Sequence, residues 1–302
     1  MGRTRLKGVR LAGFRLAIEV PSRLVWQWPT TVLEALSCSP TDPDIYVGVD
    51  VAEIHSPDWD PITYSFDGGS FEIGRIGSDW GVLVRGRNGR KQRLARIDSG
   101  FRECEVKVSP EQALRGEYPL AEPLDDLLLL HRIVRAGGLV VEGSAILREG
   151  GALAFLGLGA IPGDRRGVRE SGRGRPEVAT SGGRIVLLPN ADGIRLHGAP
   201  WTRGAGLLPL ESVRLEAIHV VSRSQRVFAE RLQGEAACAE LLEHAYAPVH
   251  DPDSALRLME IAQAFVARIP LLKIGLPEEQ RVVPFGWGQR QAAFGFAAPT
   301  AS

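Results

Sequence analysis

Residues 150–165 read GGALAFLGLGAIPGDR, an apolar run followed by a glycine-rich turn. Such a turn can place successive backbone N–H groups around an anion, and a following helix adds its positive end. The complete phosphate loop, GxxxxGK[ST], also needs a lysine for the phosphate charge and a hydroxyl for Mg²⁺. Here Pro162 lacks an amide donor, and Gly163 is followed by Asp164, whose charge would repel phosphate. The stretch is therefore either a degraded phosphate loop or a simple turn after a buried strand.

If this loop binds phosphate, the candidate residues are its glycines and the two arginines after them: Gly157, Gly159, Gly163, Arg165 and Arg166. Five arginines crowd into residues 163–176, where four glycines and Pro176 make a helix improbable. The segment reads as a solvated loop. The other interpretation is an arginine-rich lid that pairs with phosphate or an acidic peptide. Local decay of the gene would also produce this composition.

Around the loop, the second half of the chain alternates strands and helices. An apolar helix pattern covers Leu124–Ala136, with Pro123 at its start and Gly137-Gly138 as its stop. A helix over 235–246 and a second one opened by Asp251-Pro252 follow later. In the second helix, apolar residues recur at one buried face: Leu258, Ile261, Ala262, Phe265 and Ile269. Strands are expected at 139–141, 152–156, 184–188, 194–197, 213–221 and 271–274.

The first part of the chain is punctuated by turn signals and rich in β-branched and aromatic residues. Expected strands are Val9–Val20, Ile45–Val51, Pro61–Phe66, Phe71–Ile76, Trp80–Arg85, Gln92–Ile97 and Phe101–Val108. Asn88-Gly89 lies between two of them and predicts a type I′ hairpin. One short helix is expected near Thr30–Leu36.

Composition excludes several classes of protein. The 302 residues carry 36 basic and 36 acidic side chains, which argues against a global electrostatic grip on nucleic acid or an anionic membrane. Three widely spaced cysteines fit neither a disulfide framework nor a zinc site and read as reduced thiols. No window holds the eighteen or so apolar residues that span a bilayer, and charges interrupt the N-terminal apolar stretch. We therefore expect a cytoplasmic protein.

Over roughly residues 118–276 the order of sequence blocks resembles the HPr kinase/phosphorylase-like family, serine kinases related to the phosphoenolpyruvate-carboxykinase fold. The blocks are YPL at 118–120, the leucine-rich helix ending in two glycines, GGALAFLG at 150–157, GGRIVLL at 182–188 and HGAPW at 197–201. The resemblance implies an α+β or mixed α/β fold in three parts. These are a β-rich region at 1–117, a kinase-like domain with a degraded phosphate loop at 118–277 and an irregular tail at 278–302.

The resemblance also implies which catalytic positions are altered. The family's histidine before the phosphate-loop strand is replaced by Glu142, and the loop lysine and hydroxyl should fall near Gly163-Asp164, where both are absent. An aspartate pair that ligates Mg²⁺ and activates the acceptor hydroxyl is replaced by Gly182 and Gly183. Phosphoryl transfer depends on positioning and on neutralising the transferred group, so three losses imply a pseudokinase.

Three functional hypotheses follow. The first is a catalytically impaired, kinase-like protein that binds a protein or peptide partner and needs no cofactor. The alternative is an active ATP- and Mg²⁺-dependent serine kinase, in which loop arginines and acids such as Glu142 and Asp164 replace the usual groups. The third is an unrelated binding module that only echoes the block order.

Other chemistry-bearing residues read more simply as structural. His131, inside the leucine-rich helix, is expected to be a satisfied core histidine, as is His219 in its strand. His244 and His250 flank a helix end with nearby acids, but their spacing does not match a zinc site. Ser144 and Ser181 lack the surroundings of a nucleophilic serine. Trp26 and Trp28 are typical of a β core, although an exposed pair could anchor a peptide at a sheet edge.

Overall fold

A computed structural model describes residues 3–28, 36–66, 68–148, 150–157, 177–198, 212–248 and 250–277, without the side chains of 148 and 177–182. The chain forms two units, Met1–Ala136 with Ala247–Leu256 and Gly137–Tyr246 with Arg257–Ser302. The division falls later in the chain than the boundary at 117/118 expected from the sequence. Residues 30–35 of the expected short helix, the arginine-rich segment and the tail lie outside the described residues.

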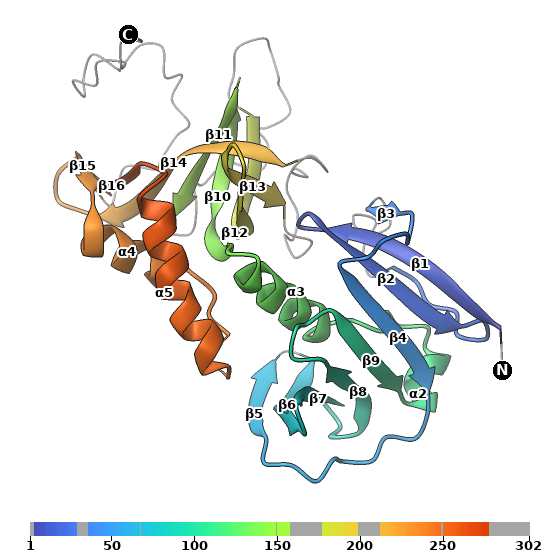
Figure 1. The fold of residues 1–302 in the computed structure, drawn as a ribbon. Coiled ribbons are helices and arrows are strands. Elements are labelled where there is room, and N and C mark those ends of the chain that lie inside the picture. Colours follow the sequence, from blue (N-terminus) through green and yellow to red (C-terminus); the bar gives the residue numbers. More distant parts are fainter. Residues whose placement is uncertain are drawn as a thin grey trace. The chain divides into compact units, whose positions relative to one another are not determined.

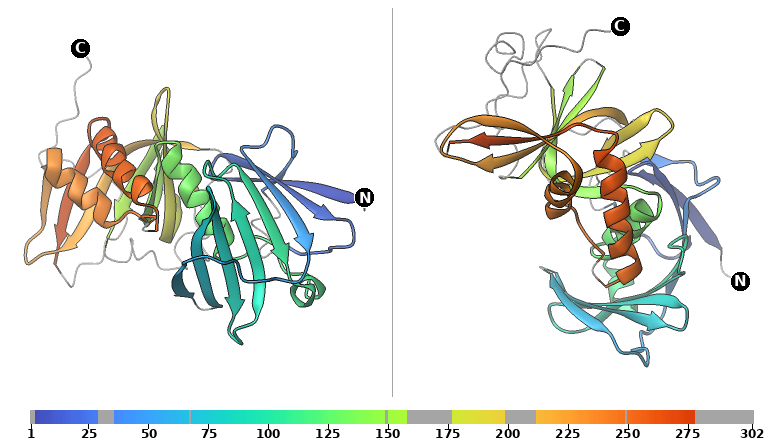
Figure 2. Two further views of the ribbon diagram at one scale, coloured as in Figure 1. Left: turned by 60° about the horizontal axis from the view of Figure 1, so that its bottom comes forward. Right: turned by 60° about the vertical axis from the view of Figure 1, so that its left-hand side comes forward.

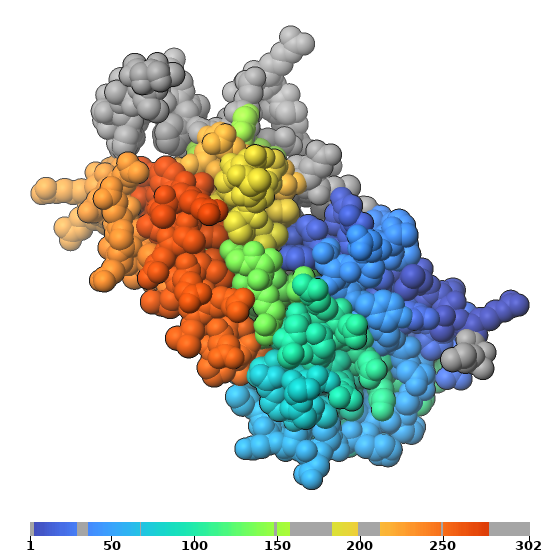
Figure 3. Space-filling model, in the orientation of Figure 1, coloured from blue at the N-terminus to red at the C-terminus, as the bar shows by residue number. Residues whose placement is uncertain are grey.

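The described strands of the first unit form one mixed sheet (Figure 1). They are β1 (Thr4–Leu11), β2 (Phe14–Pro21), β3 (Ser37–Cys38), β4 (Ile45–Val51), β5 (Ile62–Phe66), β6 (Gly69–Ile76), β7 (Asp79–Gly86), β8 (Lys91–Ile97) and β9 (Glu103–Val108). Their order is β3-β1-β2-β4-β9-β8-β7-β6-β5. β4 is parallel to both β2 and β9, and the other neighbours are antiparallel. In the space-filling view this part of the chain is coloured blue to teal (Figure 3).

The turn between β1 and β2 corrects the expectation of a single strand over Val9–Val20. Leu11 pairs with Phe14 across a two-residue loop, and both loop residues have a positive φ, +50° at Ala12 and +88° at Gly13. Two left-handed residues define a type I′ turn. Ala-Gly is a weaker turn signal than Asn-Gly or Asp-Gly, and the sequence pattern therefore predicts one continuous strand across this turn.

Asn88-Gly89 lies in a hairpin, as expected, but the turn type was wrong. The N–H of Gly89 donates to the Gly86 carbonyl at 2.8 Å, and the N–H of Gly86 donates to the Arg90 carbonyl at 3.0 Å. Of the central residues only Gly89 has a positive φ, +73°. This is a type I turn followed by a left-handed glycine. The Asn88 side chain accepts the Arg90 N–H at 3.1 Å, a local bond that favours this geometry.

Helix α3 (Leu124–Arg135) packs on one face of this sheet (Figures 1 and 2). It confirms the expected apolar helix. Leu124, Leu128 and Leu129 are fully buried, and the helix ends at Ala136 before Gly137, whose φ of +78° suits a glycine. This apolar face anchors the helix on the first unit's sheet.

A buried arginine connects the sheet to the start of α3. Arg93 on β8 is 4% exposed, and its guanidinium donates to the carbonyls of Ala121 and of Glu122, the latter at 2.9 Å. Asp125 is buried nearby in the first turn of α3 and accepts the N–H of Asp126 at 2.9 Å. Burial, followed by the neighbouring charge of Asp126, raises the pKa of Asp125 to about 8.

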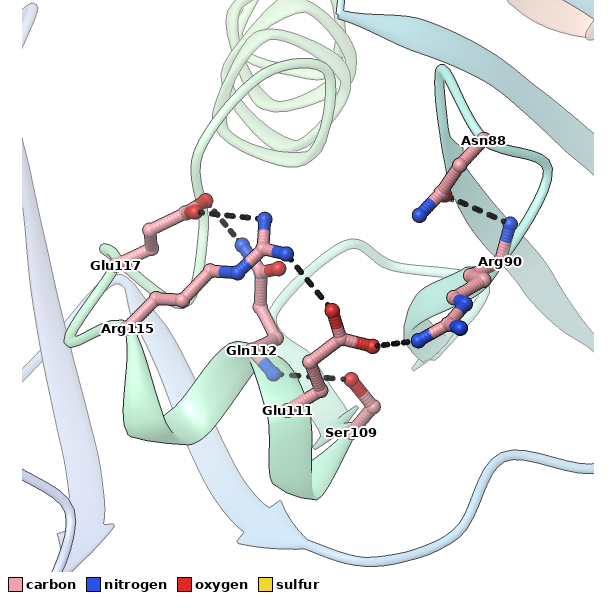
Figure 4. Close-up of polar contacts among 7 residues, drawn as sticks. All are labelled: Asn88, Arg90, Ser109, Glu111, Gln112, Arg115 and Glu117. Carbon is pink, nitrogen blue, oxygen red and sulfur yellow. Dashed lines mark hydrogen bonds and ion pairs between the residues drawn. The ribbon is translucent and has the colours of Figure 1, made fainter.

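A short helix that the sequence analysis missed, α2 (Pro110–Leu114), follows β9. Its signal was the pair Ser109-Pro110, because Ser109 Oγ accepts the N–H of Gln112 at 3.2 Å and proline occupies the first helical position. Glu111 bridges Arg90, 2.9 Å away, and Arg115, 2.7 Å away (Figure 4). These ion pairs are exposed and contribute little stability.

The second unit contains the remaining described strands. They are β10 (Leu139–Arg148), β11 (Gly151–Leu156), β12 (Glu177–Asn190), β13 (Gly193–Gly198), β14 (Val213–Arg223), β15 (Phe228–Leu232) and β16 (Leu271–Leu276). Their order is β11-β10-β12-β13-β14-β16-β15, and an additional pairing of β11 with β14 closes the sheet on itself. β15 was not expected from the sequence. The other strands cover the expected segments.

Strand β11 is fully buried and pairs with both β10 and β14. Every residue from Gly151 to Leu156 is buried, as expected for an apolar strand with neighbours on both sides. β11 runs parallel to β14, and β14 runs parallel to β16. The carboxyl ends of these strands therefore lie at the same edge of the sheet.

Two helices lie between β15 and β16 in the chain, α4 (Gly234–Glu243) and α5 (Pro252–Val266). The apolar face expected for α5 is confirmed, since Leu258, Ile261, Ala262, Phe265 and the following Ile269 are all buried. The described chain is thus a mixed α+β protein in which strand residues predominate. No helix among the described residues is long and apolar enough to cross a membrane.

Candidate functional site

The carboxyl end of β11 brings together residues from three strands. Gly143 of β10 pairs with Leu156 of β11 on one side and with Gly183 of β12 on the other. Glu142 and Gly157 are the next residues along these strands, so both lie beside this point. We call the group Glu142, Gly143, Gly157 and Gly183 the β11 mouth.

The expected site residues therefore divide into two groups. Glu142, Gly157 and Gly183 meet at the β11 mouth, and Gly182 precedes Gly183 on β12. The other candidates lie outside the described residues: Gly159, Gly163, Asp164, Arg165 and Arg166. Their assignment to a phosphate loop stays a prediction.

Gly157 is required by its surroundings as well as by its backbone. Its φ is +82°, and a Cβ at this position would lie 2.6 Å from the Val221 carbonyl oxygen and 3.3 Å from Cε1 of His244. The chain therefore leaves β11 pressed between β14 and an imidazole. A side chain would have to displace backbone as well as adopt a strained φ.

This geometry predicts a specific loss of stability. We expect Gly157→Ala to lower the free energy of unfolding of the second unit by about 2–3 kcal/mol, from φ strain plus the clash with Val221. Gly234→Ala is the matched control, because Gly234 also has a positive φ, +56°, but has open space around it. It should cost about 1 kcal/mol. Denaturant titration of both variants measures the difference, and equal losses would contradict the close approach.

His244 joins the β11 mouth although the sequence analysis did not assign it there. It caps α4, and its carbonyl accepts the N–H of Glu142 at 2.9 Å, while Tyr246 donates to the Val140 carbonyl at 2.8 Å. The segment 244–246 thus runs antiparallel beside β10, with a bridge between Val141 and Ala245. No local signal in the sequence indicates this pairing, because the residues are far apart in the chain.

Arg184 completes the set of charged groups near the mouth. It pairs with Glu142 across β10 and β12, and its guanidinium lies 4.6 Å from the ring centroid of Tyr246. Glu142 is solvent-exposed, whereas His244 and Arg184 are half-buried, so a carboxylate, an imidazole and a guanidinium lie at this edge. Such a set can bind a polar partner. A single carboxylate provides few ligands for Mg²⁺, which is usually bound by one or two carboxylates together with substrate phosphates.

A second polar cluster lies in the first unit. Nε2 of His131 in α3 lies 2.7 Å from Nε2 of His250, and Nδ1 of His131 lies 3.6 Å from Oδ2 of Asp251. That oxygen also accepts the hydroxyl of Ser254 at 2.6 Å. We call these four residues the histidine pair network. It corrects the sequence interpretation that grouped His250 with His244, since each contacts a different part of the chain.

Aromatic rings enclose the histidine pair network. The ring of Phe101 stacks on His131 with centroids 3.8 Å apart, and Trp80 meets His250 edge-on at 5.3 Å. Burial lowers the pKa of His131 to about 3 and that of His250 to about 4. A contact of 2.7 Å requires one nitrogen to act as acceptor, so the two imidazoles cannot both be cations. Both histidines are therefore neutral near pH 7. Their contact joins segment 247–256 to α3.

This network is structural rather than catalytic. His131 is fully buried and Ser254 is 3% exposed, so no substrate reaches the hydroxyl or the ring that would activate it. Ser144, considered from sequence, is also fully buried. Among the described residues no group of three or more His, Cys, Asp or Glu is arranged to hold a metal.

No protein-family model and no curated protein matches the chain.

The tryptophan pair also takes a definite place. Trp26 is 4% exposed, and its ring meets Trp28 edge-on at 4.5 Å and Tyr118 at 5.2 Å. The ammonium of Lys7 lies 4.1 Å from the Trp26 ring centroid. The pair belongs to an aromatic cluster of the first unit and does not stand free at a sheet edge.

Proposed function

We propose that the second unit is an HPr-kinase-like domain that no longer transfers phosphoryl groups and that binds a protein or peptide partner. The β11 mouth carries this proposal. The mouth lies at the end of the buried strand β11, where the family resemblance implies nucleotide binding. Its residues are Gly143, Gly157 and Gly183 together with Glu142, which is the one carboxylate among the four.

The chemistry of phosphoryl transfer explains why these residue types matter. The transferred group carries charge that cations and a metal must offset, and each such element contributes orders of magnitude in rate. Glycines at the positions of the metal-binding pair provide no ligand. The parallel strands β11, β14 and β16 nevertheless keep a buried framework that supports a binding surface at their shared edge.

Nucleotide binding tests the proposal. We expect thermal unfolding of the full chain to shift by the same small amount with ATP or GTP whether or not Mg²⁺ is present, because no metal-linked site stabilises the fold. Calorimetric titration provides the affinity under both conditions. A Mg²⁺-dependent rise in the unfolding midpoint, together with transfer of labelled phosphate to any added protein, would overturn the proposal.

The second candidate is an active serine kinase, and one observation favours it. Glu142, His244 and Arg184 gather at the same edge, so a carboxylate, a possible base and a phosphate-pairing group stand together. This candidate predicts that Glu142→Gln abolishes Mg²⁺-dependent nucleotide binding. Glu243→Gln, a neighbour of His244 on α4, is the control and should leave that binding unchanged.

A further inference from the structure

A polar pocket opens in the first unit. Its volume is about 390 Å³, several times that of a water molecule. The residues that line it are Pro43, Asp44, Tyr46, Arg102, Glu103 and Arg132. They come from the start of β4, the loop before β9 and α3, so three elements converge on it.

The loop before β9 fixes the backbone at Arg102. Oδ1 of Asp98 accepts the N–H groups of Arg102 and Glu103, both at 2.6 Å, and Oδ2 accepts that of Gly100 at 2.8 Å. Phe101 has a φ of +55°, which is unusual for a bulky residue, and its buried ring stacks on His131. The Asp98 carboxylate and the buried ring of Phe101 together hold this loop in one conformation.

Arg132 approaches the same pocket from α3 with few of its donors in use. Its Nη1 donates to the Gly100 carbonyl over a long 3.4 Å, and its Nε is buried with no hydrogen-bond partner among the described residues. The guanidinium lies 5.6 Å from the ring centroid of Phe14. Because Nε is inaccessible to water, a ligand in the pocket would meet the Nη groups of Arg132.

The positive charges of Arg102 and Arg132 repel each other. Burial lowers the pKa of Arg132 first, and the neighbouring charge of Arg102 lowers it further. Among the acidic groups, Asp44 has the largest effect on the pKa of Arg132 and raises it. Its Oδ2 already accepts the N–H of Arg15 at 2.8 Å. Both Asp44 and Glu103 are exposed to water. Two like charges held together beside an under-used donor are a typical arrangement for binding an oxyanion.

We propose that this pocket binds a small oxyanion group, a carboxylate or a phosphoryl group, between Arg102 and Arg132. Each guanidinium presents a planar fork of donors that matches two oxygens of such a group. The site lies wholly in the first unit and does not depend on the proposed function of the second.

Titration calorimetry with inorganic phosphate and with succinate, at constant ionic strength, tests the site. We expect one of the two to bind, and Arg102→Gln and Arg132→Gln each to weaken that binding at least about tenfold. Arg102 is solvent-exposed, so its variant should fold even if Arg132→Gln does not. Arg23→Gln, an exposed arginine of the same unit, should leave the affinity unchanged. Asp44→Asn should strengthen it, because a competing acceptor is neutralised.

The probes also identify the chemistry. Binding of phosphate alone assigns a phosphoryl ligand, and binding of succinate alone assigns a carboxylate. Equal affinities in the wild type, Arg102→Gln and Arg23→Gln would show general ionic association and overturn the proposal. Absence of binding by both probes up to about 50 mM would overturn it as well.

Discussion

Asp125→Asn should stabilise the first unit at pH 7 by up to about 4 kcal/mol and leave its stability at pH 4 unchanged. The native pKa of Asp125 is about 8, whereas an unfolded aspartate titrates near 4. Between these values the native protein keeps the proton and the unfolded chain releases it. Stability of the wild type is therefore lost as the pH rises from 4 to 8, and the neutral asparagine removes this loss.

The substitution keeps the contacts that hold the start of α3. Asparagine retains the oxygen that accepts the N–H of Asp126, and Arg93 stays bonded to the carbonyls of Ala121 and Glu122. Tryptophan fluorescence during denaturation reports mainly on this unit, since four of the six tryptophans are Trp26, Trp28, Trp59 and Trp80. Asp58→Asn, at an exposed site, should show no pH-dependent difference. The same gain at pH 4 and pH 7 would mean that Asp125 is ionised in the native state.

The histidine pair network produces the opposite pH dependence. Both histidines have native pKa values below the unfolded value of about 6.5, so protons bind more tightly to the unfolded chain. Stability is complete above pH 6.5 and is lost as the pH falls toward 4. For the fully buried His131 the loss at pH 5 is about 2 kcal/mol, with a smaller contribution from the partly exposed His250.

His131→Phe isolates this effect, and it is best measured in the Asp125→Asn background, where the opposing titration is absent. We expect the substitution to flatten the dependence of stability on pH between 7 and 5. At pH 7 it should cost about 1–3 kcal/mol, because His250 and Ser254 lose a polar neighbour. His55→Gln, an exposed histidine of the same unit, should leave the acid loss intact. Hydrogen exchange over α3 localises the change, and a variant that keeps the full acid loss would refute the assignment to His131.

The sequence pattern predicted most strands and helices because their causes are local. Alternation in β4 and the apolar face of α5 arise from residues a few positions apart, and Ser109-Pro110 could have indicated α2 in the same way. Turn types were harder to predict from the sequence than strands and helices. Asn88-Gly89 and Ala12-Gly13 are both followed by strands. The hydrogen bond from the Arg90 N–H to the Asn88 side chain favours the first turn type, and no comparable signal marks the second.

Part of the candidate site was also within reach of the sequence. Glu142, Gly157 and Gly183 were chosen from block order, and the register of β10 with its two neighbours brings them together. His244 was out of reach, since its place beside Gly157 follows from how α4 ends and how segment 244–246 pairs with β10. The role of the loop residues 158–166 stays a prediction.

By itself the sequence determined the alternation of most strands, the apolar faces of α3 and α5 and the residue types at the end of β11. These features depend on neighbours in the chain and on the burial of apolar side chains. The tertiary structure alone decided which ionisable groups meet. His131 and His250 are 119 residues apart, and Arg132 meets Arg102 through a loop that Asp98 organises. Their charge states depend on burial and on partners across the fold, and no local pattern encodes either.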